Sequence, residues 1–91
     1  MLKEGTLKDK VILITGGGTG LGKSMGKYFM ELGAHLIITS RRQEVLDETA
    51  TEFNEYHGEV LPISGDVRDH KDVKRIIESS LDKFGKIDCL L

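Results

Sequence analysis

Ten residues near the amino terminus, residues 15–24, read Thr-Gly-Gly-Gly-Thr-Gly-Leu-Gly-Lys-Ser and directly follow the apolar run at residues 11–14. Glycine lacks the Cβ that would hold a phosphate away from the main chain, and it permits the positive φ of a tight turn. A helix that begins behind such a loop adds unpaired N–H groups and the positive end of its dipole. The chemistry that this stretch predicts is phosphate binding.

Two further groups of polar residues also follow apolar runs. Ser40, Arg41 and Arg42 come after residues 36–39, and Gly65, Asp66 and Val67 come after residues 60–64. A chain that binds NAD places an acid about twenty residues after the glycine loop, where it holds the ribose 2′-hydroxyl. Ser40 stands at that place here, and a planar guanidinium behind it could bind a 2′-phosphate through charge-assisted hydrogen bonds. The combination predicts NADP(H) as the cofactor.

The glycine loop also satisfies a second motif. Gly17-x-x-x-x-Gly22-Lys23-Ser24 matches the P-loop of nucleoside triphosphatases, in which Lys23 would bind the β- and γ-phosphates and Ser24 would hold Mg²⁺. A P-loop needs neither the arginine pair nor the Asp-Val pair, and no clear apolar run ending in a Walker-B aspartate follows. Dinucleotide binding is therefore the favoured interpretation, with Lys23 as a solvated residue of the following helix.

Hydrophobic periodicity indicates the elements that position these residues. Continuous apolar runs predict buried parallel strands at residues 11–14, 36–39, 60–64 and 87–91. Amphipathic spacing predicts three helices between them, over residues 20–32, from Ser40 to near Gly58, and over residues 69–84. The first and third should end at Gly33 and Gly85. Ser40 and Gln43 have the spacing of a capping box, and Pro62 favours an edge position for the third strand.

The predicted fold class is α/β, a Rossmann-type parallel sheet with the order β-α-β-α-β-α-β. Right-handed crossovers give the strand order 3-2-1-4, with a ligand crevice beside the glycine loop where the order reverses. Two helices then share one face and only the third covers the other, so apolar sheet surface should be exposed. We expect Tyr28 and Leu81 to face the core and Cys89 to be a buried strand residue.

Composition excludes several function classes. The chain has 91 residues and a formal net charge of −2, which allows one small domain and gives no basic surface for nucleic acid or an anionic membrane. Its apolar runs are too short to span a bilayer. One cysteine suits a reducing compartment, so the cytoplasm is expected. His35, His57 and His70 are far apart in the sequence, which makes a metal site improbable.

The motifs together resemble those of one family. Thr15-Gly16-x-x-x-Gly20-x-Gly22 is similar to the T-G-x-x-x-G-x-G signature of short-chain dehydrogenase/reductases, and Asp66-Val67 is similar to that family's adenine contact. The resemblance covers essentially the whole chain. Residues 14–23, 39–42 and 66–69 look most similar to the 2,4-dienoyl-CoA reductase branch. That resemblance implies an oxidoreductase in which NADPH delivers hydride to a 2,4-dienoyl-CoA, giving a 3-enoyl-CoA during oxidation of unsaturated fatty acids.

Carried over to this sequence, the resemblance implies cofactor binding by Gly16, Gly18, Thr19, Gly20, Leu21, Gly22, Ser40, Arg41, Arg42, Asp66 and Val67. The family's Asn-Asn-Ala-Gly motif would begin right after Leu91, and its catalytic Ser, Tyr and Lys lie further on, so we assign no catalytic residue. Residues 1–91 are expected to be the amino-terminal part of one Rossmann domain, truncated at the fourth strand. The parent would be a homo-oligomer acting on an acyl-CoA-type substrate. A non-catalytic NADP-binding module and the triphosphatase stay open as alternatives.

Overall fold

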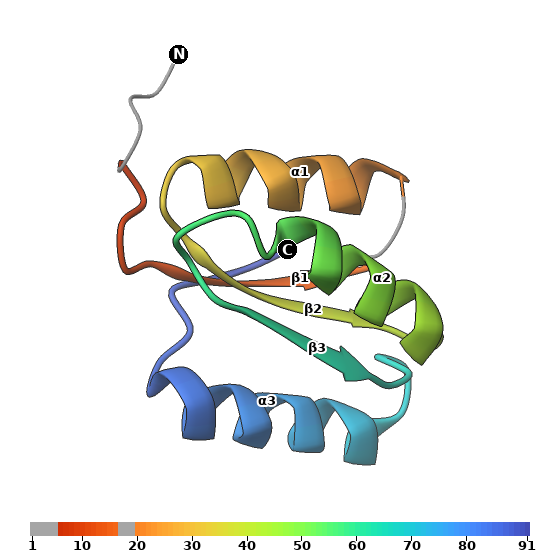
Figure 1. The fold of residues 1–91 in the computed structure, drawn as a ribbon. Helices are drawn as coiled ribbons and strands as arrows, with labels where there is room; N and C mark the ends of the chain where they lie inside the picture. The colour runs from red at the N-terminus through yellow and green to blue at the C-terminus, as the bar shows by residue number, and fades with distance from the viewer. Residues whose placement is uncertain (1–5, 17–19) are drawn as a thin grey trace.

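A parallel sheet of four strands lies between helices in the computed structural model, which describes residues 6–16 and 20–91 (Figure 1). The strands are β1 Val11–Thr15, β2 His35–Ser40, β3 Val60–Ser64 and β4 Cys89–Leu90. The helices are α1 Gly20–Glu31, α2 Gln43–Phe53 and α3 His70–Phe84. The α/β class and the alternating order predicted from the sequence are confirmed.

The strands lie in the order β3-β2-β1-β4 and every neighbouring pair is parallel, as predicted. β3 is an edge strand, which agrees with Pro62, a residue that cannot donate a backbone hydrogen bond. The register pairs Thr15 with Thr39 and Ser40 with Ser64. The carboxyl ends of β1, β2 and β3 are therefore level with one another, and the loops that follow them start at one edge of the sheet.

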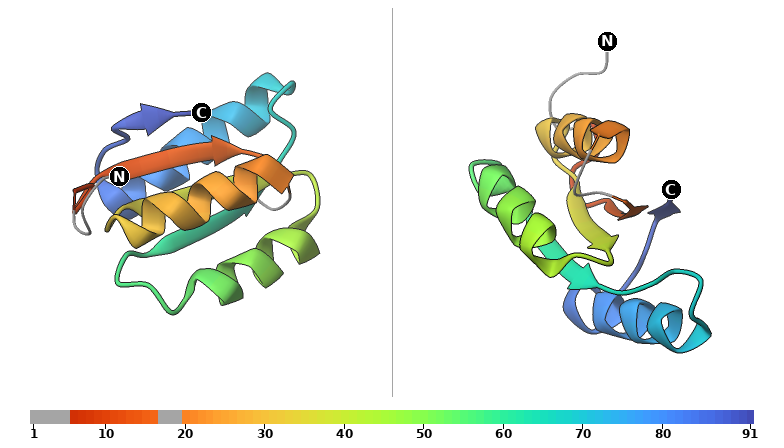
Figure 2. Two further views of the ribbon diagram at one scale, coloured as in Figure 1. Left: turned by 90° about the horizontal axis from the view of Figure 1, so that it is seen from above. Right: turned by 90° about the vertical axis from the view of Figure 1, so that its right-hand side faces the viewer.

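The helices cover the two faces of the sheet unequally. Figures 1 and 2 show α1 and α2 on one face and α3 on the other, as right-handed crossovers require. The core under α1 and α2 contains Ile12, Ile14, Met30, Ala34, Leu36, Ile38, Leu46 and Phe53. The core under α3 contains Val11, Leu13, Ile37, Ile63 and Ile76. Alternate strand residues thus enter opposite cores, which is why the strands read as continuous apolar runs.

Glycine and aspartate set the helix ends that the sequence indicated. Asp69 accepts a hydrogen bond from the backbone N–H of Lys71 at the start of α3, and Gly85 ends that helix with a φ of 77°. The N–H of Gly85 donates to the carbonyl oxygen of Leu81 at 2.8 Å. Gly33, with a φ of 98°, follows α1. Both glycine positions require the left-handed conformation that other residues rarely adopt.

The capping box predicted for α2 is wrong. Ser40 pairs with Ser64 as the last residue of β2, so the chain is still extended there and the helix begins only at Gln43. Arg42 occupies the N-cap position, and the Ser40 Oγ accepts a hydrogen bond from its backbone N–H at 3.3 Å. The Gln43 side chain donates to Asp47 Oδ1 at 2.8 Å instead of reaching back.

Three expected core residues lie at the surface. Tyr28 and Leu81 are exposed, and so is Cys89. Cys89 belongs to the two-residue strand β4, shorter than predicted, which pairs only with β1. The expected exposure of apolar sheet surface is not found at β1 and β2, whose apolar residues are buried, whereas Leu90 of β4 is exposed. A hollow of about 220 Å³ opens between the sheet and α3. Its lining is Leu13, Thr15, Thr39, Val67, Val73, Ile76, Ile77 and Leu90.

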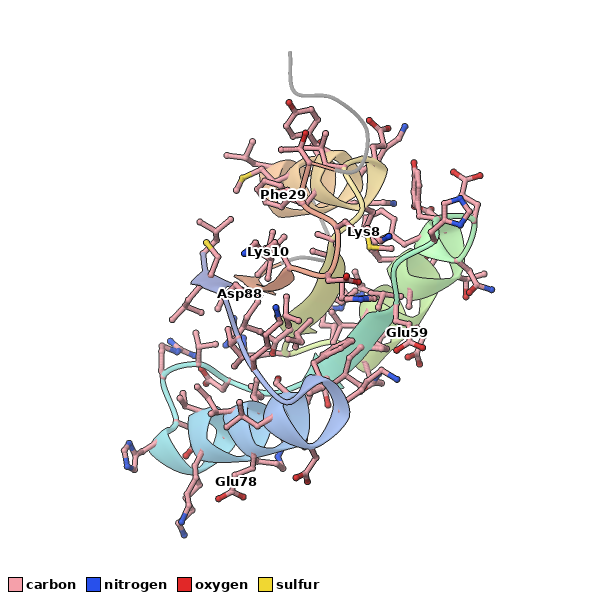
Figure 3. The ribbon with its side chains drawn as sticks, turned by 90° about the vertical axis from the view of Figure 1, so that its left-hand side faces the viewer. Lys8, Lys10, Phe29, Glu59, Glu78 and Asp88 are labelled. Carbon is pink, nitrogen blue, oxygen red and sulfur yellow. The ribbon has the colours of Figure 1, made fainter. Side chains whose placement is uncertain are left out.

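Asp88 connects β4 to β1 at the amino edge of the sheet, where Figure 3 shows it near Lys10. Its Oδ2 accepts from the Val11 N–H at 2.8 Å and from Lys86 Nζ at 3.0 Å, and its own N–H donates to the Val11 carbonyl at 2.8 Å. The hydrogen bond from Val11, followed by that from Lys86, holds the pKa of Asp88 below its ordinary value. Asp88 therefore stabilises the join in its ionised form.

This pKa shift predicts an acid-dependent weakening of the fold. Because the folded state has the lower pKa, the contribution of Asp88 is present above the unfolded pKa and is lost as the pH falls through the folded one. Asp88→Asn should lower the free energy of unfolding at about pH 7, and the gap to the unmodified protein should narrow by about pH 3. Urea unfolding at both pH values measures this. A gap that is the same at both would contradict it.

Candidate functional site

The residues that the sequence singled out come together at the carboxyl edge of the sheet. The N–H of Gly16, after β1, donates to the carbonyl of Thr39 at 2.7 Å. The N–H of Gly65, after β3, donates to the carbonyl of Ser40 at 2.8 Å. These backbone bonds extend the ladder beyond the strands, so the three loops lie next to one another. The right-hand view of Figure 2 looks onto this edge.

The glycine loop has the backbone that its composition predicted. Gly16 and Gly20 have φ values of 70° and 56°, and a Cβ at either position would meet no described atom within 4 Å. The conformation at these two positions therefore favours glycine, and no described residue fills the space beside them. Gly18 and Thr19, also predicted to bind the cofactor, lie outside the described residues, as does Gly17 of the P-loop motif.

The first turn of α1 is suited to an anion. Leu21 is exposed there and Gly22 is half-buried. This turn contains no acidic residue, whereas α2 and α3 carry Glu44 and Asp72 in theirs. An acid in the first turn would compensate the positive end of the helix dipole. At α1 that positive end is left for a ligand, next to the open glycine backbone.

The two arginines after β2 differ in their partners, a difference that the sequence does not reveal. Arg42 Nε lies 3.3 Å from Glu44 Oε1, and the pKa of Glu44 is lowered by its own backbone N–H and then by this arginine. Arg41 is exposed and makes no hydrogen bond or ion pair with the described part of the chain. Its charge contributes to lowering the pKa of Asp66 across the gap between the two loops. Arg41 is thus the guanidinium available to a ligand.

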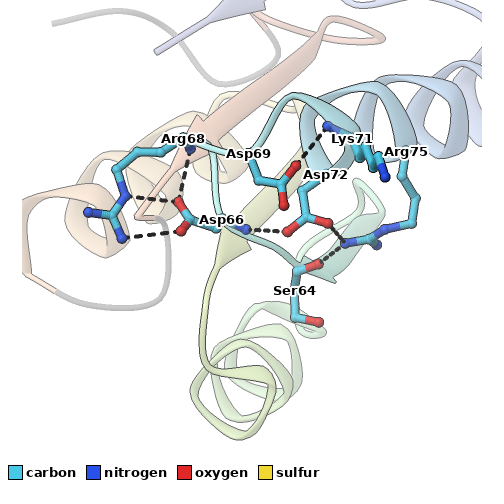
Figure 4. Close-up of polar contacts among 7 residues, drawn as sticks. All are labelled: Ser64, Asp66, Arg68, Asp69, Lys71, Asp72 and Arg75. Atoms are coloured by element: carbon cyan, nitrogen blue, oxygen red, sulfur yellow. Dashed lines mark hydrogen bonds and ion pairs between the residues drawn. The ribbon is translucent and has the colours of Figure 1, made fainter.

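Asp66 is held by Arg68, a residue that the sequence reading did not assign to the site. Figure 4 shows the contacts: Asp66 Oδ1 accepts from the Arg68 backbone N–H at 2.9 Å and from Arg68 Nε at 3.1 Å. Asp66 Oδ2 accepts from Arg68 Nη2 at 3.1 Å. The side-chain bonds, followed by the backbone bond, hold the pKa of Asp66 below its usual range. The Asp-x-Arg spacing was the available signal for this pair.

The loop that carries Asp66 is attached to α3 by a second acid and arginine. The N–H of Asp66 donates to Asp72 Oδ2 at 2.9 Å. Arg75 Nη2 lies 3.5 Å from Asp72 Oδ1 and donates to the carbonyl of Ser64 at 2.6 Å. Half of the surface of Val67 is exposed, at 50%, and this residue lines the hollow together with Thr39, whose buried Oγ1 has no partner in the described part of the chain. A polar atom of a ligand could satisfy that hydroxyl.

Lys23, the lysine of the P-loop motif, has a carboxylate partner in the described part of the chain. It is partly exposed and forms an ion pair with Glu52 near the end of α2. The sequence predicted a solvated lysine and did not predict this partner. The described residues contain no group of three metal-ligating side chains. Among the same residues, no helix is long and apolar enough to cross a membrane.

The arrangement offers groups that could hold the parts of a dinucleotide. Among the described residues, it combines a glycine backbone at a helix N-terminus, the guanidinium of Arg41 without an ion-pair partner and the ionised carboxylate of Asp66 along one sheet edge. The first can hold a pyrophosphate and the second a 2′-phosphate, while the third can accept from the amino group of a base.

Comparison with known proteins agrees with this geometry. A family model described as short chain dehydrogenase matches residues 10–91. A probable 2,4-dienoyl-CoA reductase of Bacillus subtilis is 36% identical over 85 residues, covering 93% of this chain and 34% of that protein. Ipsdienol dehydrogenase of Ips pini is 44% identical over 82 residues, covering 90% of this chain and 30% of that protein. The chain therefore spans about a third of the length of the curated relatives it matches.

Solved structures with the same fold hold either cofactor. A 3-ketoacyl-(acyl-carrier-protein) reductase from Brucella melitensis complexed with NADH has a TM-score of 0.85 and 38% identity, covering 92% of this chain and 33% of that one. L-Sorbose reductase from Gluconobacter frateurii complexed with NADPH and L-sorbose has a TM-score of 0.91 and 29% identity, covering 97% and 34%. The fold alone thus does not select between NADH and NADPH.

Proposed function

Since this chain belongs to the short-chain dehydrogenase family, we propose that the full-length protein is an NADPH-dependent reductase and that this chain supplies its dinucleotide-binding half. The family match and the names of the relatives support an oxidoreductase. The choice of NADPH rests on residues of this chain, and the substrate rests on its motifs.

Each loop at the carboxyl edge would bind a different part of the cofactor. The backbone of the glycine loop and the first turn of α1 would hold the pyrophosphate, through Gly16, Gly18, Thr19, Gly20, Leu21 and Gly22. Ser40 and Arg41 would bind the 2′-phosphate. Asp66 would accept from the adenine amino group, and the exposed side chain of Val67 would pack near the ring.

Arg41 is the single observation on which the NADPH assignment depends most. It follows the strand where an NAD-binding chain places an acid, it is exposed, and it has no ion-pair partner in the described part of the chain. Arg42, predicted from the sequence to share this role, is paired with Glu44. We therefore propose Arg41 as the principal 2′-phosphate ligand, with Arg42 adding positive charge nearby.

The proposed substrate class is a 2,4-dienoyl-CoA. When bound, the nicotinamide supplies a hydride, and with one proton this reduces the conjugated diene to a 3-enoyl-CoA and leaves NADP⁺. This chain's residues would bind and orient the cofactor at the crevice between β1 and β4, where a substrate would meet it. The motifs at residues 14–23, 39–42 and 66–69 support this substrate and product. The Bacillus subtilis relative is named for the same substrate class but for a (2E)-enoyl-CoA product, so it supports the substrate alone.

Consumption of NADPH by the purified full-length protein tests the reaction. We expect NADPH oxidation that depends on a 2,4-dienoyl-CoA, with the 3-enoyl-CoA identified by mass spectrometry and chromatography against standards. A 3-ketoacyl thioester and a terpene alcohol with NADP⁺ serve as competing substrates, because relatives of similar identity are named for such compounds. Faster turnover of either competitor would contradict the dienoyl-CoA assignment.

The oligomeric state and the compartment of the parent protein are proposed from the family resemblance and the composition. A homo-oligomer is proposed for the parent, and the cytoplasm is proposed as its compartment on the basis of one cysteine. A non-catalytic NADP-binding module is the rival. Tight NADPH binding without turnover of any of these three substrates would favour that rival, whereas failure to bind NADPH would contradict both.

A further inference from the structure

We propose that Arg68 is a positioning residue that fixes the carboxylate of Asp66 so that a single acceptor position faces the base of the dinucleotide and selects adenine. The inference rests on the proposed NADPH site, and it adds to that site a residue and a base specificity. Arg68 itself need not touch the cofactor.

The count of hydrogen bonds at Asp66 carries the argument. An ionised carboxylate offers about four acceptor positions, two on each oxygen. Oδ1 already receives two donors from Arg68, the backbone N–H at 2.9 Å and Nε at 3.1 Å. Oδ2 receives only Nη2, at 3.1 Å. One acceptor position on Oδ2 is therefore left for a ligand (Figure 4).

The pairing also fixes the direction in which that position points. Two parallel N–H···O bonds between a guanidinium and a carboxylate define the plane of the carboxylate, which a single point charge cannot do. The backbone of Asp66 is held separately, since its N–H donates to Asp72 Oδ2 and its carbonyl accepts from the Asp69 N–H at 2.9 Å. Arg68 thus orients the side chain of Asp66, while Asp72 and Asp69 hold the main chain of Asp66.

Arg68 is not needed to fill the protein interior. Its side chain is 73% exposed and no part of either apolar core contains it. The other charges near the carboxylate are Arg41 after β2, Asp72 on α3, and Arg75, which pairs with Asp72. In the described part of the chain, the donors to the Asp66 carboxylate all come from Arg68. Removal of Arg68 should therefore free the carboxylate without unfolding its surroundings.

A fixed, ionised acceptor discriminates between purine bases. Adenine presents an amino group that donates a hydrogen bond, whereas hypoxanthine presents a carbonyl oxygen at the same place. Opposite Asp66, that oxygen would meet a negative charge and leave the acceptor unpaired. Loss of a charge-assisted hydrogen bond changes affinity by about tenfold or more. The nicotinamide hypoxanthine dinucleotide phosphate, deamino-NADPH, is therefore a direct probe of the arrangement.

The test is the ratio of dissociation constants for deamino-NADPH and NADPH, measured by fluorescence titration of the full-length protein. We expect a ratio of about ten for the unmodified protein and about two or less for Arg68→Ala. Arg68→Lys keeps the charge but cannot hold both oxygens, so it should not restore the ratio. Asp66→Asn should also lower the ratio of the two dissociation constants. Adding Arg68→Ala to Asp66→Asn should change that ratio no further.

Arg41→Ala is the matched control, since it should weaken both nucleotides equally and leave the ratio unchanged. If NADPH does not bind, or Arg41→Ala leaves its affinity unchanged, the proposed cofactor site itself fails. If both of those expectations hold but Arg68→Ala preserves the ratio, only the role of Arg68 is overturned. Full restoration by Arg68→Lys would also overturn it, because charge alone would then suffice.

Discussion

Arg41→Ala should weaken NADPH binding about tenfold or more while changing NADH binding by no more than about twofold. NADPH and NADH differ only in the 2′-phosphate, so a residue that binds this group affects one cofactor and not the other. Titration of the folded variant with each nucleotide at one fixed ionic strength measures the effect. The ionic strength must be held constant because salt screens exposed charges.

The expected size follows from the surroundings of Arg41. Its guanidinium is exposed and has no ion-pair partner in the described part of the chain, so binding a phosphate breaks no existing pair. A charge-assisted hydrogen bond contributes about 1.5 to 3 kcal/mol, and each 1.4 kcal/mol corresponds to a factor of ten. We therefore expect the loss of Arg41 to cost at least one such factor in NADPH affinity.

Arg42→Ala provides the comparison within the same loop. Arg42 already pairs with Glu44 at 3.3 Å, and this contact would have to open before the guanidinium could bind a phosphate fully. The loss of NADPH affinity should be smaller than for Arg41→Ala. Equal losses for the two variants, or equal losses of NADPH and NADH affinity in Arg41→Ala, would contradict the assignment.

Gly58→Ala should lower the free energy of unfolding by about 3 kcal/mol, the upper part of the range for an inserted methyl group that meets a rigid neighbour. The new Cβ would overlap the carbonyl oxygen of Ala34 and lie 3.0 Å from its carbonyl carbon. Both atoms belong to the backbone just before β2, and the Leu36 N–H donates to the carbonyl of Glu59 right beside them. The close approach of the two segments starts the pairing of β2 with β3.

Gly85→Ala is the control for Gly58→Ala. A Cβ at Gly85 would meet nothing within 4 Å, but the φ of 77° is strained for alanine. That strain should lower the free energy of unfolding by only about 1 kcal/mol. Urea unfolding of the two variants gives both values. A decrease in the free energy of unfolding for Gly58→Ala no larger than that for Gly85→Ala would contradict the close packing of Gly58 against Ala34.

Local features of the sequence predicted most of the fold. The continuous apolar runs indicated buried parallel strands, and Asp69, Gly33 and Gly85 marked helix ends because capping depends on a few adjacent residues. The capping box at Ser40 failed because the strand pairing of Ser40 with Ser64 is a tertiary contact that keeps the chain extended.

The errors in the core have a similar cause. Amphipathic spacing identifies the apolar face of a helix, but it does not show which other element packs against that face. Tyr28 and Leu81 have the correct spacing, yet both are exposed. Cys89 is in the apolar run that predicted β4, but the strand pairs with β1 alone and the cysteine is exposed. Partners distant in the sequence decided all three.

The sequence predicted where the candidate site lies, but not which of its charged side chains pair with one another. Parallel strands bring their carboxyl ends to one edge, which places Gly16, Arg41 and Asp66 together from sequence order alone. The pairing of Arg42 with Glu44 and of Arg68 with Asp66 depends on side-chain geometry. The first pair distinguishes Arg42 from Arg41, which has no ion-pair partner in the described part of the chain. The second adds Arg68, which lies within the motif at residues 66–69 but was not assigned to the site from the sequence.

We propose that this chain builds a site for a dinucleotide with a 2′-phosphate. The most direct test of this proposal is the pair of dissociation constants of the unmodified full-length protein for NADPH and NADH, measured in the same buffer. The account predicts that NADPH binds more tightly by about tenfold or more. Equal affinity, or tighter binding of NADH, would contradict it.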